Sequence, residues 1–190
     1  MTERDDIRLI ALVGMPGAGK TEAVEYLVNK GWPNIYFGGI MYDEMRKAGI
    51  EITAESQQIF REQLRAREGK DFIAKRAIER INNLLDAGQR NIVLDGVYSW
   101  SEYRLLKSDF HKMLEVVAIV APRKVRYHRL ANRPERPFTT DEAMKRDYTE
   151  IENIEKGGPI AIADHYIIND ETLEVLHEKI DKIMSGTFAE

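Results

Sequence analysis

Short apolar runs alternate along this chain with longer stretches in which apolar residues recur at helical spacing. The runs cover residues 8–13, 34–37, 91–94, 114–121 and 166–168, and each is followed by glycine, proline, asparagine or aspartate. Continuous apolar runs with such boundaries are typical of strands that are buried on both faces. Strands that alternate with helices predict an α/β fold, with a parallel sheet covered by helices on both faces.

The stretches between the runs are expected to be helices. Apolar positions three or four residues apart, and glycines at 31, 49, 69 and 88, indicate where the helices end. The expected helices are Thr21–Lys30, Ile40–Ala48, Thr53–Glu68, Asp71–Ala87, Ser101–Lys107, Arg123–Asn132, Thr140–Lys156 and Thr172–Met184. Thr53 and Thr140 are the expected caps of their helices, and Gly157-Gly158-Pro159 is expected to end the second of these.

The expected elements form one domain over residues 1–190, because a chain of this length buries one substantial core. Two helical segments are inserted between successive strands, at about residues 40–87 and about 129–152.

A phosphate-binding motif follows the first apolar run. Its pattern is G-x-x-x-x-G-K-[ST], and its residues are Gly14, Met15, Pro16, Gly17, Ala18, Gly19, Lys20 and Thr21. Small residues let successive backbone N–H groups surround phosphate oxygens, Lys20 reaches the β- and γ-phosphates, and the Thr21 hydroxyl is placed for Mg²⁺. The following helix directs its positive end at the same anion. A glycine-rich turn without a ligand is the alternative, and it leaves Lys20 unexplained.

Asp95 ends the third apolar run, at the edge of the sheet where ligands gather in open α/β folds. A carboxylate there can hold Mg²⁺ or its waters. The alternative is a turn residue, since Asp-Gly is a common turn pair. Beside a phosphate-binding motif, the metal role is favoured.

The second insertion is rich in arginine. Its candidates for catalysis are Arg129, Arg133, Arg136 and Arg146. Phosphoryl transfer concentrates negative charge on the migrating group, and arginines on a closing loop stabilise that charge and exclude water. A solvated basic surface is the alternative. In the first insertion, Arg61 and Arg65 share a helix face, where they either grip an anionic acceptor or pair with neighbouring glutamates.

Composition excludes several classes of function. The chain has no cysteine, so disulfides and thiolate chemistry are absent, and its net charge of −4 argues against binding a nucleic-acid polymer. Residues 1–6 are polar and no apolar run approaches a membrane span, so no membrane partner and a cytoplasmic location are expected. The oligomeric state stays open.

With these residues in view, the chain resembles the nucleotide-kinase group of phosphate-loop proteins. It is most similar to the uncharacterised adenylate-kinase-related and dephospho-CoA-kinase-like branch best known from archaea. The similarity covers nearly the whole chain. It includes residues 13–21, 37–38, 64–65, 68–69, 73–76 and 94–97, and it ends with 163–169 and 172–174.

The resemblance implies a five-stranded parallel sheet, ATP with Mg²⁺, an acceptor-binding helical insertion and an arginine lid. It places Asn169 near the adenine and Gly38, Arg65 and Arg76 in the acceptor site.

Two positions depart from the family pattern. Tyr42 and Tyr98 stand where the family has arginines that bind the acceptor's phosphate. A tyrosine donates one hydrogen bond or stacks on a ring, but it cannot supply a bidentate cationic fork. Either the acceptor is less charged than a nucleoside monophosphate, or Arg61, Arg65 or Arg104 holds its phosphate.

These observations together predict an ATP-dependent phosphotransferase that acts on a nucleotide-like or nucleoside-like small molecule. Two alternatives remain open at this point. One is a nucleotide-dependent ATPase or switch that moves a partner, and the other is an ATP-binding protein without kinase activity.

Overall fold

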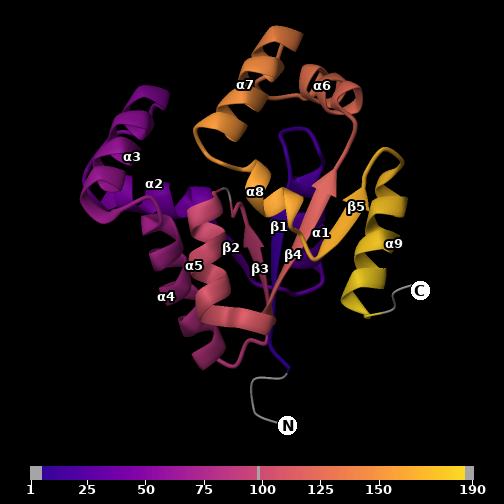
Figure 1. Ribbon diagram of the computed structural model, residues 1–190, viewed down its shortest axis with the longest axis horizontal. Helices are drawn as coiled ribbons and strands as arrows, with labels where there is room; N and C mark the ends of the chain where they lie inside the picture. The colour runs from indigo at the N-terminus through magenta and orange to yellow at the C-terminus, as the bar shows by residue number, and fades with distance from the viewer. Residues whose placement is uncertain (1–5, 98, 187–190) are drawn as a thin grey trace.

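The computed structural model describes residues 6–97 and 99–186. At its centre is a five-stranded sheet with the order β2-β3-β1-β4-β5, and all of its strand pairs are parallel (Figure 1). The strands are β1 (Arg8–Val13), β2 (Asn34–Tyr36), β3 (Asn91–Asp95), β4 (Leu114–Val120) and β5 (His165–Ile168). The predicted α/β fold class is confirmed.

Helices connect the strands and cover the sheet. They are α1 (Lys20–Asn29), α2 (Phe37–Lys47), α3 (Ala54–Glu68), α4 (Phe72–Asp86), α5 (Trp100–Phe110), α6 (Arg123–Asn132), α7 (Thr140–Glu152), α8 (Gly157–Ala161) and α9 (Leu173–Met184). One 3₁₀ turn, His111–Met113, leads into β4. Among the helices of the described residues, none combines the length and the apolar character needed to cross a membrane.

Two apolar layers lie on opposite faces of the sheet. On one face, Ile10, Leu12 and Val117 pack with residues of α1 and α9 such as Leu27 and Ile180. On the other face, residues of the same strands pack with α2, α4 and α5. Alternate residues of each strand point to opposite faces, so both faces must be apolar, which explains the continuous apolar runs.

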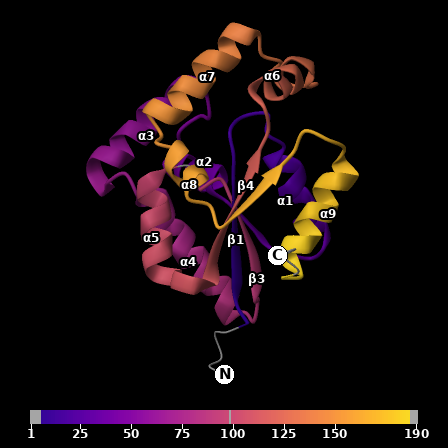
Figure 2. The ribbon, with the colours of Figure 1, turned by 45° about the vertical axis from the view of Figure 1, so that its right-hand side comes forward.

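The carboxyl ends of the strands point toward α6 and α7, which lie beyond the sheet in both views (Figure 2). The helices of the first insertion, α2 to α4, form a smaller core of their own around Met41, Met45, Leu64 and Phe72. In open α/β sheets, ligands bind at the carboxyl ends of the strands. A ligand of this protein is therefore expected between the first insertion and the α6–α7 segment.

The structure corrects the expected course of the chain after α7. Helix α7 ends at Glu152, and Gly157-Gly158-Pro159 begins α8 instead of ending α7. Proline fits there because the first turn of a helix leaves its N–H groups without helical partners. The cap of α7 is Thr139, whose side chain accepts from the N–H of Glu142, so Thr140 is the first helical residue.

Helix α2 begins at Phe37, three residues earlier than expected. Its first turn therefore contains Gly38 and Gly39, and the Tyr36 ring lies against both. A Cβ on Gly38 would come within 2.4 Å of the Tyr36 hydroxyl, so a larger residue there would displace the Tyr36 ring. The sequence pattern did not predict this helix start, because glycine is normally unfavourable within a helix.

Candidate active site

A cleft of about 990 Å³ lies at the carboxyl ends of the strands. It collects most of the predicted site residues from segments far apart in sequence. Those that line it are Gly14, Met15, Pro16, Gly17, Ala18, Gly19, Lys20, Thr21, Gly38, Tyr42, Arg65, Arg129, Arg133, Arg136, Arg146 and Asn169. The fold thus brings the phosphate-binding motif, the first insertion and the α6–α8 segment to one site.

The conformation of the phosphate-binding loop is fixed by two glycines and by contacts with Asn169. Gly17 and Gly19 have left-handed backbones, with φ of 79° and 98°. A Cβ on Gly19 would meet the Asn169 amide nitrogen at 2.1 Å, so glycine is required there for close packing as well as for its φ. Asn169 is buried, and its side-chain amide donates to the Ala18 carbonyl at 2.8 Å. The backbone carbonyl of Asn169 accepts from the Arg129 guanidinium at 2.8 Å.

Lys20 and Asp95 are ion-paired. Lys20 is the first residue of α1 and Asp95 the last of β3, and neighbouring strands β1 and β3 bring the two together. Among the described residues, no group of three or more acidic, histidine or cysteine side chains converges. Mg²⁺ takes one or two protein oxygens and keeps phosphate and water ligands, and Thr21 and Asp95 stay the predicted protein ligands.

The arginines differ in what holds them. Arg129 contacts Asn169, the Arg133 Nε donates to the Arg136 carbonyl at 2.8 Å, and the Arg133 guanidinium lies 4.6 Å from the centre of the Phe138 ring. Arg136 has a φ of 50° and is exposed. The side chain of Arg146 is half exposed and pairs with Glu150 at 2.6 Å.

A buried ion pair that the sequence did not reveal ties α6 to α7 and to the loop. Arg126 donates to both carboxylate oxygens of Asp147, at 2.9 and 2.7 Å, and also to the Pro16 carbonyl at 3.0 Å. Tyr127 donates to the same carboxylate at 3.1 Å. The spacing of 21 residues between Arg126 and Asp147 crosses a loop, so no helical pattern predicts it.

On the acceptor side, the cleft is lined by Tyr36, Tyr42, Arg61, Arg65 and Lys70, among others. Within the described residues, no ion pair involves Arg61 or Arg65. Burial, with smaller contributions from Tyr42 and Asp95, raises the pKa of Tyr36, so its hydroxyl stays a neutral donor.

Two acceptor expectations have a different outcome. Among the described residues that line the cleft, Arg76 is absent; its guanidinium contacts Glu68 at 2.7 Å and Glu44 at 3.7 Å. These contacts join α4 to α2 and α3, which is the role of a structural ion pair. Tyr98 lies outside the described residues.

Sequence reasoning missed Lys156 and Glu150, which also line the cleft. Both are buried and their side chains are 2.5 Å apart. A lysine before a glycine pair looks like an ordinary helix-end cation, and no sequence pattern marks Lys156 as buried.

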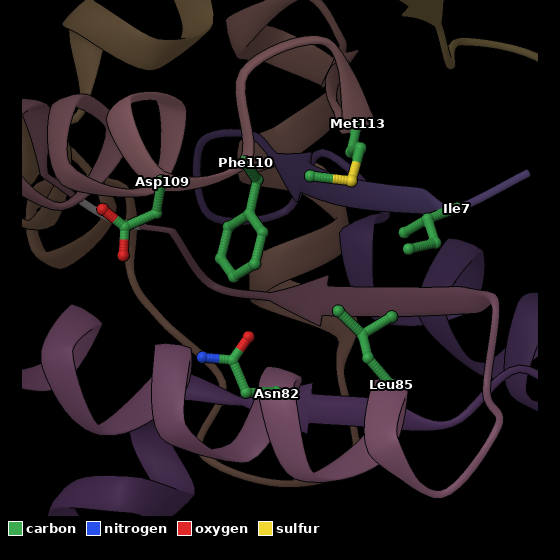
Figure 3. Close-up of a pocket in the computed structure, with 6 residues that line it drawn as sticks. All are labelled: Ile7, Asn82, Leu85, Asp109, Phe110 and Met113. Atoms are coloured by element: carbon green, nitrogen blue, oxygen red, sulfur yellow. The ribbon is translucent and has the colours of Figure 1, made fainter. Parts of the chain in front are cut away.

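A second hollow, of about 290 Å³, lies at the opposite end of the sheet (Figure 3). It is lined by Ile7, Asn82, Leu85, Asp109, Phe110 and Met113. Its only charged lining side chain among the described residues is the Asp109 carboxylate, which repels phosphate. The described residues that line this hollow include no cation, whereas several lysines and arginines line the cleft.

Comparison with known proteins agrees with this geometry. Residues 10–155 match the family described as "AAA domain". A UPF0200 protein of Thermococcus gammatolerans is 32% identical over 185 residues, which cover 94% of this chain and 96% of the relative. A second, from Sulfurisphaera tokodaii, is 34% identical over 183 residues, with 94% and 96% covered. The chain belongs to the UPF0200 family. The predicted membership of a P-loop, kinase-like archaeal family is thereby confirmed.

Solved structures show the same fold at low identity. A shikimate kinase from Bacteroides thetaiotaomicron superimposes with a TM-score of 0.59 and 14% identity, covering 94% of this chain and 98% of that one. The shikimate kinase of Acinetobacter baumannii, solved with shikimate, gives 0.55 and 20%, with 96% of each chain covered. This UPF0200 protein thus has a P-loop kinase-like fold.

Proposed function

We propose that this UPF0200 protein transfers the γ-phosphoryl group of ATP to a small molecule that carries an anionic group. The observation that carries the proposal is the placement of cations from two separate insertions opposite one phosphate-binding loop in one cleft. A protein that only binds or hydrolyses ATP needs the loop, but it does not need Arg61 and Arg65 on the far side.

The donor half would work through positioning and charge. The loop amides and Lys20 hold the phosphates, and Thr21 and Asp95 are the candidates to hold Mg²⁺, which when bound neutralises charge on the β- and γ-phosphates. Lys20 is paired with Asp95 in this structure. The phosphates would compete for that lysine, and Asp95 would then turn toward the metal.

On the acceptor side, Arg61 and Arg65 would bind the anionic group of the acceptor. Their guanidinium groups supply the bidentate recognition that Tyr42 cannot. Tyr36 and Tyr42 add aromatic faces and hydroxyl donors to the same wall. These features favour an acceptor with an anionic group next to a ring, such as a nucleotide, over an uncharged nucleoside.

The test is an ADP-release screen of nucleoside monophosphates, dephospho-CoA and nucleosides, with Lys20→Ala as the matched control. An acceptor-dependent release that Lys20→Ala reduces by about a hundredfold or more is expected, because the lysine acts on the transferring group. Calorimetry should show weakened Mg·ATP binding in the variant. ADP release that is the same with and without every acceptor would identify an ATPase. ATP binding without any ADP release would identify an inactive nucleotide-binding protein. Either result contradicts the proposal.

A further inference from the structure

Lys156 occupies an unusual position for a lysine. It lies between α7 and α8, its side chain is only 5% exposed, and it lines the cleft of the phosphate-binding loop. The preceding residue, Glu155, has a left-handed backbone with a φ of 62°. Such a conformation is costly for a residue with a side chain, and it turns the chain so that Lys156 enters the cleft.

Glu150 holds Lys156 there. The Lys156 ammonium lies 2.5 Å from one oxygen of the Glu150 carboxylate, and the Arg146 guanidinium lies 2.6 Å from the other. The Lys156 N–H also donates to the Glu150 carbonyl at 3.1 Å. One buried carboxylate therefore fixes two cations at the wall of the cleft, and this cluster of three side chains carries a net charge of about +1.

The charges around the cluster make it receptive to an anion. Burial lowers the pKa of Lys156, Glu150 opposes this, and the positive charges of Lys20 and Arg146 lower the pKa further. Lys156 and Lys20 line the same cleft. Lys20 is paired with Asp95 and Lys156 with Glu150, and a phosphate in the cleft would add a further anionic partner for both lysines.

We infer that Lys156 is a second phosphate-binding lysine, which contacts the γ-phosphate of the bound nucleotide together with Lys20. Glu150 is its positioning residue. The inference rests on the proposed function, because it assigns a residue to the same nucleotide. The γ-phosphate is favoured over the α- and β-phosphates because Lys20 reaches the β- and γ-phosphates and the loop amides enclose the inner ones.

The inference predicts a selective loss of affinity. Lys156→Met should weaken binding of an ATP analogue with an imido bridge between the β- and γ-phosphates by about tenfold, the usual effect of one charge-assisted hydrogen bond. Affinity for ADP should stay within about twofold of wild type, because ADP lacks the phosphate that Lys156 contacts. Calorimetry with Mg²⁺ measures both.

Two further variants complete the experiment. Lys145→Met removes an exposed lysine from α7 and should change neither affinity. Lys156→Arg keeps the charge and should recover part of the analogue affinity. In Lys156→Met, Glu150 keeps its contact with Arg146, so the variant should fold, and circular dichroism checks this.

The outcomes separate this inference from the proposed function. If wild type binds neither nucleotide, the proposed function fails. If wild type binds the analogue and Lys156→Met leaves the ratio of the two affinities unchanged, Lys156 does not contact the γ-phosphate. An equal loss of both affinities has the same meaning, since it shows a general disturbance of the loop.

Discussion

At the scale of single residues, Asn169 shows how a side chain outside the motif shapes the phosphate-binding loop. It follows β5 directly, yet its amide donates to the carbonyl of Ala18, and its bulk fills the space where a side chain at position 19 would lie. The family resemblance places Asn169 near the adenine. The structure adds a second role, because Asn169 packs against Gly19 and donates a hydrogen bond to Ala18 of the loop.

Replacing Asn169 by alanine should therefore reduce both stability and ATP affinity. The buried Ala18 carbonyl would lose its donor, which costs about 1–3 kcal/mol of the free energy of unfolding. Urea denaturation and calorimetry measure the two effects. The matched control is Asn132→Ala, because the Asn132 amide only donates within its own helix, to the His128 carbonyl on an exposed surface. Equal stability of the two variants would show that the support of the loop is unimportant.

At the scale of elements, α6 and α7 behave as one unit because Arg126 and Asp147 join them. Both side chains are about nine-tenths buried, and the Arg126 guanidinium forms two hydrogen bonds with the Asp147 carboxylate. Such a pair need not add stability compared with an apolar pair, but losing one partner leaves the other charge buried alone. The position of α7, and with it Arg146 and Glu150, depends on this contact.

Asp147→Asn should lower the free energy of unfolding by about 3 kcal/mol, because Arg126 would lose its counter-charge. Phosphoryl transfer should fall as well, since the cations of α7 would lose their fixed position. Chemical denaturation and the ADP-release assay are the measurements. Asp141→Asn, at an exposed site in the first turn of α7, should cost at most about 0.5 kcal/mol. A stable Asp147→Asn would contradict the joint role of the two helices.

The same elements show what the sequence could and could not predict. Strands β1 and β4 are local apolar runs, and residues 14–21 form a local motif, so both could be recognised without the fold. The contacts of Arg126 and Lys156 depend on partners brought together by packing. Because burial turns an ordinary lysine or arginine into a site residue, composition and spacing alone do not distinguish Lys156 from the exposed Lys145.

At the scale of the whole molecule, two insertions face each other across one cleft. Lys70, at the turn before α4, pairs with Glu155, at the turn before α8, at 3.2 Å. Both side chains are largely exposed, so this pair adds little stability. It does show that the first insertion and the α6–α8 segment meet at one point. We expect closure over a ligand to proceed from there.

Hydrogen exchange should detect that closure. With an analogue that joins ATP to the acceptor found in the screen, amides of α3 and α7 should gain protection, because closing segments exclude water from the bound phosphates. The amides of β1, β3 and β4 are buried in the sheet and serve as the internal reference. Unchanged exchange in α7 would assign Arg146 to a solvated surface.

Pro16 gives the loop a division of roles. Proline has no N–H, so this position offers phosphate no donor, and what its backbone has left is a carbonyl. Arg126 uses that carbonyl as its anchor. The loop therefore has N–H groups that are proposed to bind phosphate, and a carbonyl at residue 16 that holds α6. A shift of the loop on binding phosphate would be transmitted to α6 and α7 through residue 16, so we expect the eight residues that are proposed to hold the nucleotide to report its presence as well.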